Sequence, residues 1–188
     1  MSAEPIKENP ANCKDSETHR LPFDQIENEK LRQLVQYWES LRKGRKMPSR
    51  SDINPVDLSF MLGWIILLEV HHTGIPDDPF HFRYRLVGAE LEKVSQVQFQ
   101  GRWAHELSDN FQRYAALLAF SEAAKTGEPN FYHIILRRNE KELFYERVTL
   151  PLTAGIDTKP EMLLVGISNG KSRYYFVDSP AMKPKENN

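Results

Sequence analysis

The sequence predicts one α+β domain on a five-stranded antiparallel sheet, with helices on one face and an N-terminal amphipathic helix. Two segments with strand patterns precede a helical middle region and three follow it, which is typical of an antiparallel α+β sheet. The first and last of them, residues 64–70 and 162–167, are nearly continuous apolar runs, as expected for central strands covered on both faces. The other three alternate polar and apolar residues. The strand order 2-1-5-4-3 satisfies both observations.

Composition limits the classes of protein to which the chain can belong. Its 188 residues, 40% of them hydrophobic, suffice for one well-buried core and are few for two ordinary domains. The formal net charge of -1 gives no general field that would attract nucleic acid or an anionic membrane. Cys13 is the only cysteine, which excludes an internal disulfide and a cysteine-based zinc site. No signal-peptide pattern is seen, and the longest apolar run, WIILL, cannot cross a bilayer, so we expect a cytoplasmic protein without a membrane partner.

The N-terminal part divides into a leader and a helical segment. Residues 1–22 are polar, contain prolines and have no hydrophobic period, so we expect a disordered leader. In the helical segment, residues 23–62, Asp24 and Glu27 have the spacing of a capping box, and a helical apolar face follows until Gly44. This face consists of Leu31, Leu34, Val35, Trp38 and Leu41.

A short helix is expected before the first strand, because Asn54 and Pro55 suit its cap and first turn and Gly63 suits its end. The sequence HHTGIPDDP then separates the first strand from the second, FRYRL, as a turn would. The pattern changes from strand to helix at Gly88, and this helix is expected to run to about Gln96.

The middle region ends with a longer helix, which Asp109 can cap and which Gly127 and Pro129 stop. The strands FYHIILRR and LFYERVTLPL then flank the polar sequence NEKE, which indicates a hairpin. The main domain is expected to span residues 63–170, and residues 171–188 are expected to form a charged C-terminal tail.

Five short sequences, in this order and spacing, resemble the bacterial PAS-like domain family of small, mostly single-domain proteins of proteobacteria. They are RKMPSRSDINP, FRYRLVGAEL, GRWAHEL, TGEP and YERVTLPL, and the resemblance covers Leu31 to Ile167. It implies the strand order given above and a small ligand, or a partner domain, between the sheet and the helices. The family has no shared catalytic residues to transfer, so the resemblance implies a sensor or interaction module and not an enzyme.

Gly88 supports a second hypothesis. RLVGAE approaches the Arg-x-x-Gly-x-Gly/Ala loop of GNAT-related acetyltransferases, whose backbone N–H groups hold the pyrophosphate of coenzyme A. An acyltransferase-like enzyme using this turn would have strands that splay in parallel beside Gly88. However, Glu90 places a negative charge where phosphate should lie. We favour the simpler interpretation, in which Gly88 supplies a corner conformation denied to other residues.

Six residues are predicted to line a ligand cavity. Alternation along LFYERVTLPL places Glu146 on the more apolar face of its strand, where an isolated carboxylate is costly unless it is paired or hydrogen-bonded. One hypothesis is a salt bridge to an arginine of the sheet, and the other is a polar anchor for the ligand. Aromatic walls would come from Tyr84, Trp103, Phe111, Tyr114 and Tyr132, although core packing also explains most of these rings.

The histidines do not predict a metal or haem site, and we expect no cofactor. His71 and His72 are adjacent on a strand and point to opposite faces, so they cannot both bind one ion through regular backbone. His81 could meet one of them across the first hairpin, which gives two histidine ligands at most, with an acid such as Asp77 or Asp78 as a third. A lone His105 is more often a partly buried polar side chain than a haem ligand. The basic residues between Arg42 and Arg50 have no interleaved aromatics, so we expect a solvated helix end and no nucleic-acid partner.

The first helix has two roles open to it, since its apolar face can cover the central strands or pair with a second copy. The resemblance to PAS domains implies the second role, and the two can coexist. We therefore expect a non-catalytic sensor or protein-interaction module of bacterial signalling. Its expected partners are a small apolar or amphipathic ligand, a second copy bound through the N-terminal helix, and an unidentified signalling protein.

Overall fold

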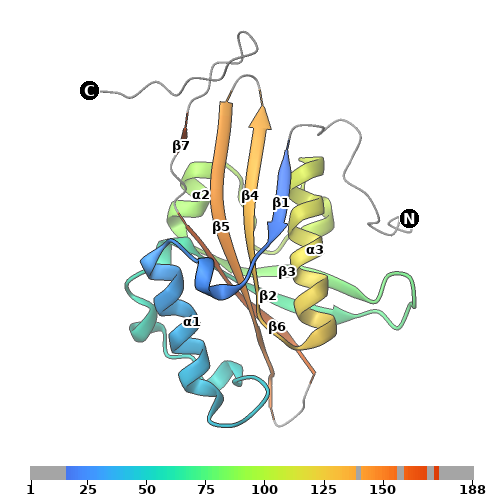
Figure 1. Ribbon diagram of the computed structural model, residues 1–188. Helices are drawn as coiled ribbons and strands as arrows, with labels where there is room; N and C mark the ends of the chain where they lie inside the picture. The colour runs from blue at the N-terminus through green and yellow to red at the C-terminus, as the bar shows by residue number, and fades with distance from the viewer. Residues whose placement is uncertain (1–15, 139–140, 156–158, 169–171, 174–188) are drawn as a thin grey trace.

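The computed structural model describes residues 16–138, 141–155, 159–168 and 172–173. The sheet contains β1 (Glu17–Arg20), β2 (Ile65–His72), β3 (Phe80–Val87), β4 (Asn130–Arg138), β5 (Lys141–Leu152), β6 (Met162–Ile167) and β7 (Ser172–Arg173). The helices are α1 (Glu29–Arg42), α2 (Ala89–Ser95) and α3 (Asn110–Thr126), with short 3-10 turns between them. In Figure 1, α1 and α3 lie on opposite sides of the sheet.

The order of strands in the sheet is β1-β4-β5-β6-β2-β3, and β7 pairs with β5. Each of these strand pairs is antiparallel. The five predicted strands correspond to β2, β3, β4, β5 and β6, so the predicted order 2-1-5-4-3 is confirmed. The apolar runs in β2 and β6 form two adjacent interior strands of this order. Both faces of these two strands are buried, which explains why they lack polar alternation.

The strand β1 was not predicted. It pairs with the outer edge of β4, with Thr18 opposite Ile134, and the N–H of Leu21 donates to the carbonyl of Phe131 at 3.0 Å. This part of the expected disordered leader therefore has regular structure, which corrects the prediction at its C-terminal end. An edge strand is held by backbone hydrogen bonds that need no apolar pattern, so the composition could not reveal it. Residues 1–15, including Cys13, lie outside the described residues.

The helix α1 covers one face of the sheet. Leu31, Leu34 and Trp38 are fully buried in a cluster with apolar residues of β2, β5 and β6. The helix begins later than predicted, because its cap is Asn28, whose side chain accepts from the N–H of Leu31 at 3.2 Å. Asp24 belongs instead to a separate 3-10 turn, so the predicted capping box is wrong. The apolar face of α1 therefore covers the central strands, which is the first of the two roles proposed for it.

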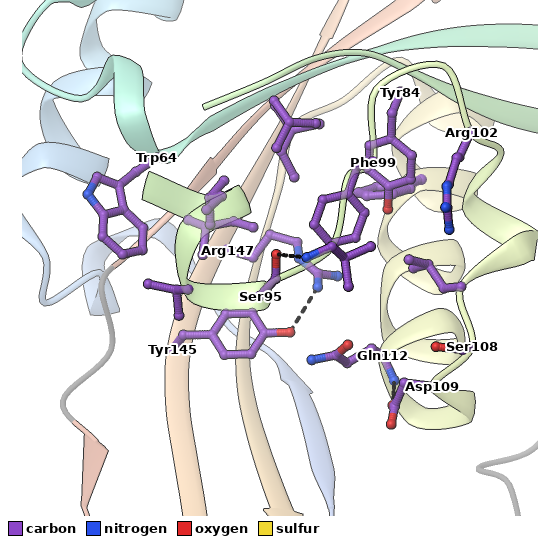
Figure 2. A pocket seen from close by; sticks show the side chains of 18 of the residues that line it. Trp64, Tyr84, Ser95, Phe99, Arg102, Ser108, Asp109, Gln112, Tyr145 and Arg147 are labelled. Atoms are coloured by element: carbon purple, nitrogen blue, oxygen red, sulfur yellow. Dashed lines mark hydrogen bonds between the residues drawn. The ribbon is translucent and has the colours of Figure 1, made fainter. Parts of the chain in front are cut away.

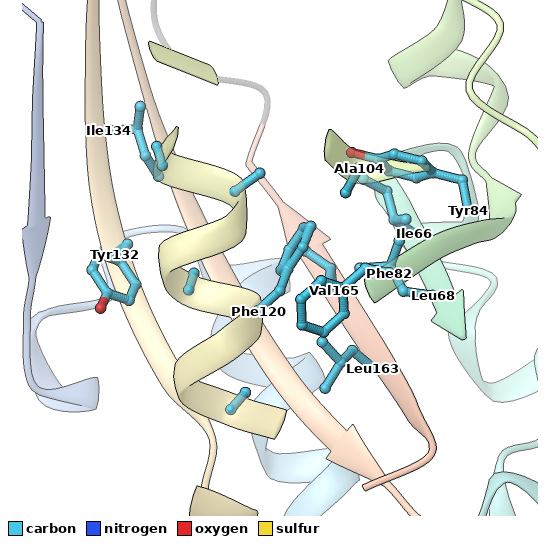
Figure 3. Packing of buried hydrophobic residues seen from close by; sticks show 14 of the residues in the cluster. Ile66, Leu68, Phe82, Tyr84, Ala104, Phe120, Tyr132, Ile134, Leu163 and Val165 are labelled. Atoms are coloured by element: carbon cyan, nitrogen blue, oxygen red, sulfur yellow. The ribbon is translucent and has the colours of Figure 1, made fainter. Parts of the chain in front are cut away.

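The helix α3 covers the other face, where Phe120 and a row of buried alanines pack on β3, β4 and β6 (Figure 3). Small side chains let the helix lie close to the sheet. The predicted caps are confirmed, since Asp109 accepts from the N–H of Gln112 at 2.6 Å and Gly127 ends the helix with φ +67. In the described part of the chain, no helix is both long and apolar enough to cross a membrane.

The predictions for the short helix before the first strand and for the C-terminal tail can be compared with the structure. The predicted short helix before the first strand is a 3-10 turn over Pro55–Leu58, and Asn54 caps it as expected by accepting from the N–H of Val56 at 3.1 Å. Ser172–Arg173, expected in the C-terminal tail, pairs with β5. The predicted hairpin is formed by β4 and β5, and residues 139–140 at its tip lie outside the described residues.

Candidate functional site

A cavity of about 460 Å³ lies between the sheet and the helices α2 and α3. Its volume falls within the range of about 300–1,000 Å³ that is usual for small-molecule sites. Strands β3 and β5 provide one wall, α2 and the segment 95–109 provide the rim, and α3 provides the opposite wall (Figure 2). The apolar lining includes Phe99, Leu143 and Phe120, and the polar lining includes Ser95, Gln112 and Arg147.

Two of the predicted aromatic residues line this cavity, namely Tyr84 and Trp103. The ring of Tyr84 lies 5.3 Å from that of Phe99, measured between centroids. The remaining three lie elsewhere, which corrects their predicted place. Phe111 is fully buried in the core, Tyr114 packs against its edge, and the hydroxyl of Tyr132 donates to Glu122 at 2.8 Å. Their rings are explained by core packing, the simpler of the two interpretations.

Glu146 lies on the other face of the sheet, away from the cavity. Its side chain is buried, with the residue 2% exposed, and it accepts from the backbone N–H groups of Glu27 and Asn28 at 2.8 and 2.9 Å. The ring of His133 adds a contact of 3.3 Å. Among the described residues, Glu146 has no arginine partner, and its side chain does not line the cavity. The carboxylate instead fixes the start of α1 to β5, which is a structural role.

Replacing Glu146 by glutamine should lower the free energy of unfolding by about 2 kcal/mol, because an amide offers one oxygen where the carboxylate accepts with two. Hydrogen exchange at the amides of Glu27 and Asn28 should also become faster. The matched control is Glu39→Gln, which replaces an exposed acid of α1 and should lower the free energy of unfolding by less than about 0.5 kcal/mol. Equal unfolding curves for the two variants would show that the bonds to the start of α1 contribute nothing.

Arg147 is a buried charged residue of the cavity that was not predicted from the sequence. It is 4% exposed; one terminal nitrogen donates to the carbonyl of Ala115 at 2.9 Å and the other to the hydroxyl of Tyr145 at 3.1 Å. Alternation along the strand predicts that Arg147 lies on the more polar face and Glu146 on the other face. The missed signal was that a strand next to the central one is covered on both faces, so its polar face is buried as well.

Tyr84 should contribute to the pH dependence of stability, because burial raises the pKa of its hydroxyl well above the ordinary value of 10.0. Above about pH 10 the unfolded chain loses a proton that the folded protein keeps, so stability falls as the pH rises. The decline from this group is at most about 1.4 kcal/mol per pH unit. Urea unfolding between about pH 9 and about pH 11 should show a shallower decline for Tyr84→Phe than for wild type. Identical slopes would contradict this contribution.

Trp103 lines the cavity, and three histidine rings pack around it. The centroids of His71, His105 and His81 lie 4.9, 5.9 and 6.0 Å from that of Trp103. Ring packing therefore accounts for these side chains. Among the described residues, no group of three histidine, cysteine or acidic side chains is placed to hold a metal ion.

The basic cluster after α1 is largely occupied by local contacts. Arg42 pairs with Glu39 at 2.8 Å, Arg45 pairs with Asp52 at 2.7 Å, and Lys46 donates to the carbonyl of Thr126 at 2.6 Å. These contacts join the loop after α1 to neighbouring turns and to the end of α3. The predicted solvated helix end thus also has a structural role.

Gly88 has a different function from the one predicted. Its φ of -65 and ψ of 139 are open to any residue, so a special corner conformation is not the reason for glycine. A Cβ at this position would lie 2.3 Å from the carbonyl carbon of Gly63, so only glycine allows the two backbones to approach. The N–H of Gly88 donates to the carbonyl of Ile65 at 2.8 Å, and β2 and β3 pair antiparallel up to this point. The parallel splay required by the coenzyme A hypothesis is therefore not found beside Gly88.

Comparison with known proteins is consistent with this architecture. The family model described as PAS domain matches residues 26–166, a range that includes α1, the strands β2 to β5, most of β6 and all the cavity-lining residues except Ile167 and Ser168. No curated protein and no solved structure matched the chain. The antiparallel sheet order, the helices between β3 and β4 and the match over most of the chain agree, and the protein belongs to the PAS domain family.

Proposed function

We propose that the protein is a non-catalytic sensor module that holds a small apolar or amphipathic molecule in the cavity beside Tyr84 and Phe99. The observation that carries this proposal is the cavity itself, about 460 Å³ in volume and lined mainly by aromatic and aliphatic side chains, with polar and charged residues among them. Ligand sites in proteins commonly have this composition. The PAS family assignment supports a sensor or interaction role of this kind.

Alternating residues of β5 connect the cavity with α1. Leu143, Tyr145 and Arg147 line the cavity, while Glu146 and Val148 between and beside them face α1 on the reverse side of the sheet. A ligand that shifts β5 would therefore also move the residues that hold α1. Ligand binding can act as a signal only if it favours one of two such arrangements. We infer that α1, together with the chain that precedes it, carries the output.

A neutral dye tests the proposal, because N-phenylnaphthylamine fluoresces strongly in apolar surroundings. Wild-type protein should bind it at one site per chain. Leu143→Trp should weaken binding at least about 10-fold by filling the cavity from the rigid strand β5. The control is Phe144→Trp at the next position, whose side chain points to the opposite face, packs against His133 and should leave binding unchanged. Absence of dye binding to the wild type, or equal loss in both variants, would overturn the proposal.

We also propose that the protein forms a homodimer, the arrangement expected from the N-terminal helix. Leu31, Leu34 and Trp38 are covered by the sheet, so a dimer has to use other parts of α1 or its flanking segments. Sedimentation equilibrium should give twice the chain mass at micromolar concentration. A single species at the chain mass would contradict the dimer and leave the cavity proposal unaffected.

A further inference from the structure

The guanidinium group of Arg147 is a buried cation without a carboxylate partner. Among the described residues it has no ion pair, both of its hydrogen-bond acceptors are neutral oxygens, and its Nε has no hydrogen-bond partner. Arg137 shows the usual arrangement in the same sheet, since it pairs with Glu17 at 2.6 Å and with Glu142 at 2.7 Å. A buried charge is unfavourable unless it is paired, so the environment of Arg147 is incomplete.

The surroundings of Arg147 offset this cost only in part. Its guanidinium carbon lies 5.6 Å from the ring centre of Phe120 and 5.7 Å from that of Tyr145, distances at which aromatic faces attract a cation. Two acidic residues also line the cavity, but neither forms an ion pair with Arg147. Asp109 accepts from the N–H of Gln112, and Glu106 accepts from the N–H of Trp103. Figure 2 shows Arg147 and Tyr145 side by side among the lining residues.

We propose, building on the proposed cavity function, that the ligand is a small carboxylic acid whose carboxylate pairs with Arg147 and whose apolar body lies against Phe99 and Tyr84. A carboxylate matches the planar fork of a guanidinium and brings the single negative charge that one buried cation requires. The hydroxyl of Tyr145, which now accepts from Arg147, can donate its proton to the same carboxylate. Arg102, the other arginine of the lining, is exposed at the rim, so the interior has no second cation to match a phosphate dianion.

Displacement of N-phenylnaphthylamine by three probes with the same tail separates the alternatives. Octanoate, octanol and octyl phosphate carry an anionic carboxylate, a neutral hydroxyl and a phosphate on the same apolar chain. Wild-type protein should bind octanoate about 10-fold to 100-fold more tightly than octanol, the range expected for a hydrogen-bonded charge pair. Octyl phosphate should bind more weakly than octanoate.

Variants of the arginine assign the preference to one group. Arg147→Met keeps the side-chain volume without the charge, and should bind octanoate and octanol equally while still binding the dye. Arg147→Lys keeps the charge without the fork and should retain part of the preference. Tyr145→Phe leaves the cation in place and should lower the affinity for octanoate only a few-fold. This variant supplies a second test if Arg147→Met does not fold. Arg102→Met, at the rim of the same cavity, is the matched control and should behave as wild type.

The possible failures are distinguishable from one another. Equal binding of octanoate and octanol by wild type would overturn the carboxylate proposal and leave the cavity function standing, since the dye still binds. A preference that persists in Arg147→Met and disappears in Arg102→Met would assign the anion to the rim and would also overturn it. Tighter binding of octyl phosphate than octanoate would replace the carboxylate with a phosphate. Absence of dye binding would remove the proposed function, and this inference with it.

Discussion

Replacing Gly88 by alanine should lower the free energy of unfolding by about 3 kcal/mol or more, at the upper end of overpacking effects. The added Cβ would lie 2.3 Å from the carbonyl carbon and 2.4 Å from the carbonyl oxygen of Gly63. These are backbone atoms, so the clash cannot be relieved by a change of rotamer. Urea unfolding measures the loss, and Tyr84 and Trp103 provide fluorescence signals on the same side of the sheet.

Gly155→Ala is the matched control for this change. Among the described residues, a Cβ at Gly155 would meet no atom within 4 Å, and the backbone at this position is not in the left-handed region. The substitution should therefore be neutral or slightly stabilising, because alanine lowers the entropy of the unfolded chain. A loss at Gly88 no larger than that at Gly155 would contradict the close approach of the two backbones.

Replacing Trp38 by alanine should lower the free energy of unfolding by about 3–5 kcal/mol, the range for removing a large aromatic side chain from a core. Trp38 is fully buried where α1 meets the sheet, and its indole N–H donates to the carbonyl of Pro151 at 2.9 Å. The cavity left by alanine would lie between α1 and β5. Thermal or urea unfolding gives the magnitude.

Trp38→Phe separates packing from hydrogen bonding at the same position. It keeps most of the apolar volume but leaves the carbonyl of Pro151 without its partner, so it should cost about 1–2 kcal/mol. A loss of less than about 1 kcal/mol for Trp38→Ala would mean that α1 does not depend on this face for its place on the sheet. The homodimer would then have a free apolar face available to it.

The central sheet could be predicted because burial on two faces leaves a distinct pattern. The apolar runs in β2 and β6 identified two adjacent interior strands, which left few possible positions for the three alternating strands. The caps at Asp109 and Gly127 were found because side-chain capping and left-handed glycine are local features. Such signals reside within a few residues of sequence.

The parts that escaped prediction depend on distant partners. Glu146 was recognised as a buried carboxylate, but its partners are backbone N–H groups 118 and 119 positions away, which no side-chain pattern reveals. The strand β1 is held by backbone hydrogen bonds to β4, and these leave no pattern in its side chains. Its polar sequence therefore suggested disorder. Gly88 was assigned a turn conformation because its contact with Gly63 becomes apparent only when the chain is folded.

The residues of the candidate site also differ in whether a local sequence signal or a distant contact determines their place. Tyr84 and Trp103 line the cavity, and the strand and loop that carry them could be recognised from the sequence. Arg147 was overlooked because a charged residue on the polar side of an alternating strand ordinarily faces water. Here that side faces α3 and the cavity, and the arginine is buried in it.

The central claim is that the cavity between the sheet and the helices α2 and α3 holds a small molecule. A crystal structure of the protein purified from its native source tests this most directly, because the electron density reports both occupancy and chemical class. We predict density for a bound molecule beside Tyr84 and Phe99, with its anionic end at Arg147. A cavity closed by its own side chains, or filled only by ordered water, would contradict the claim.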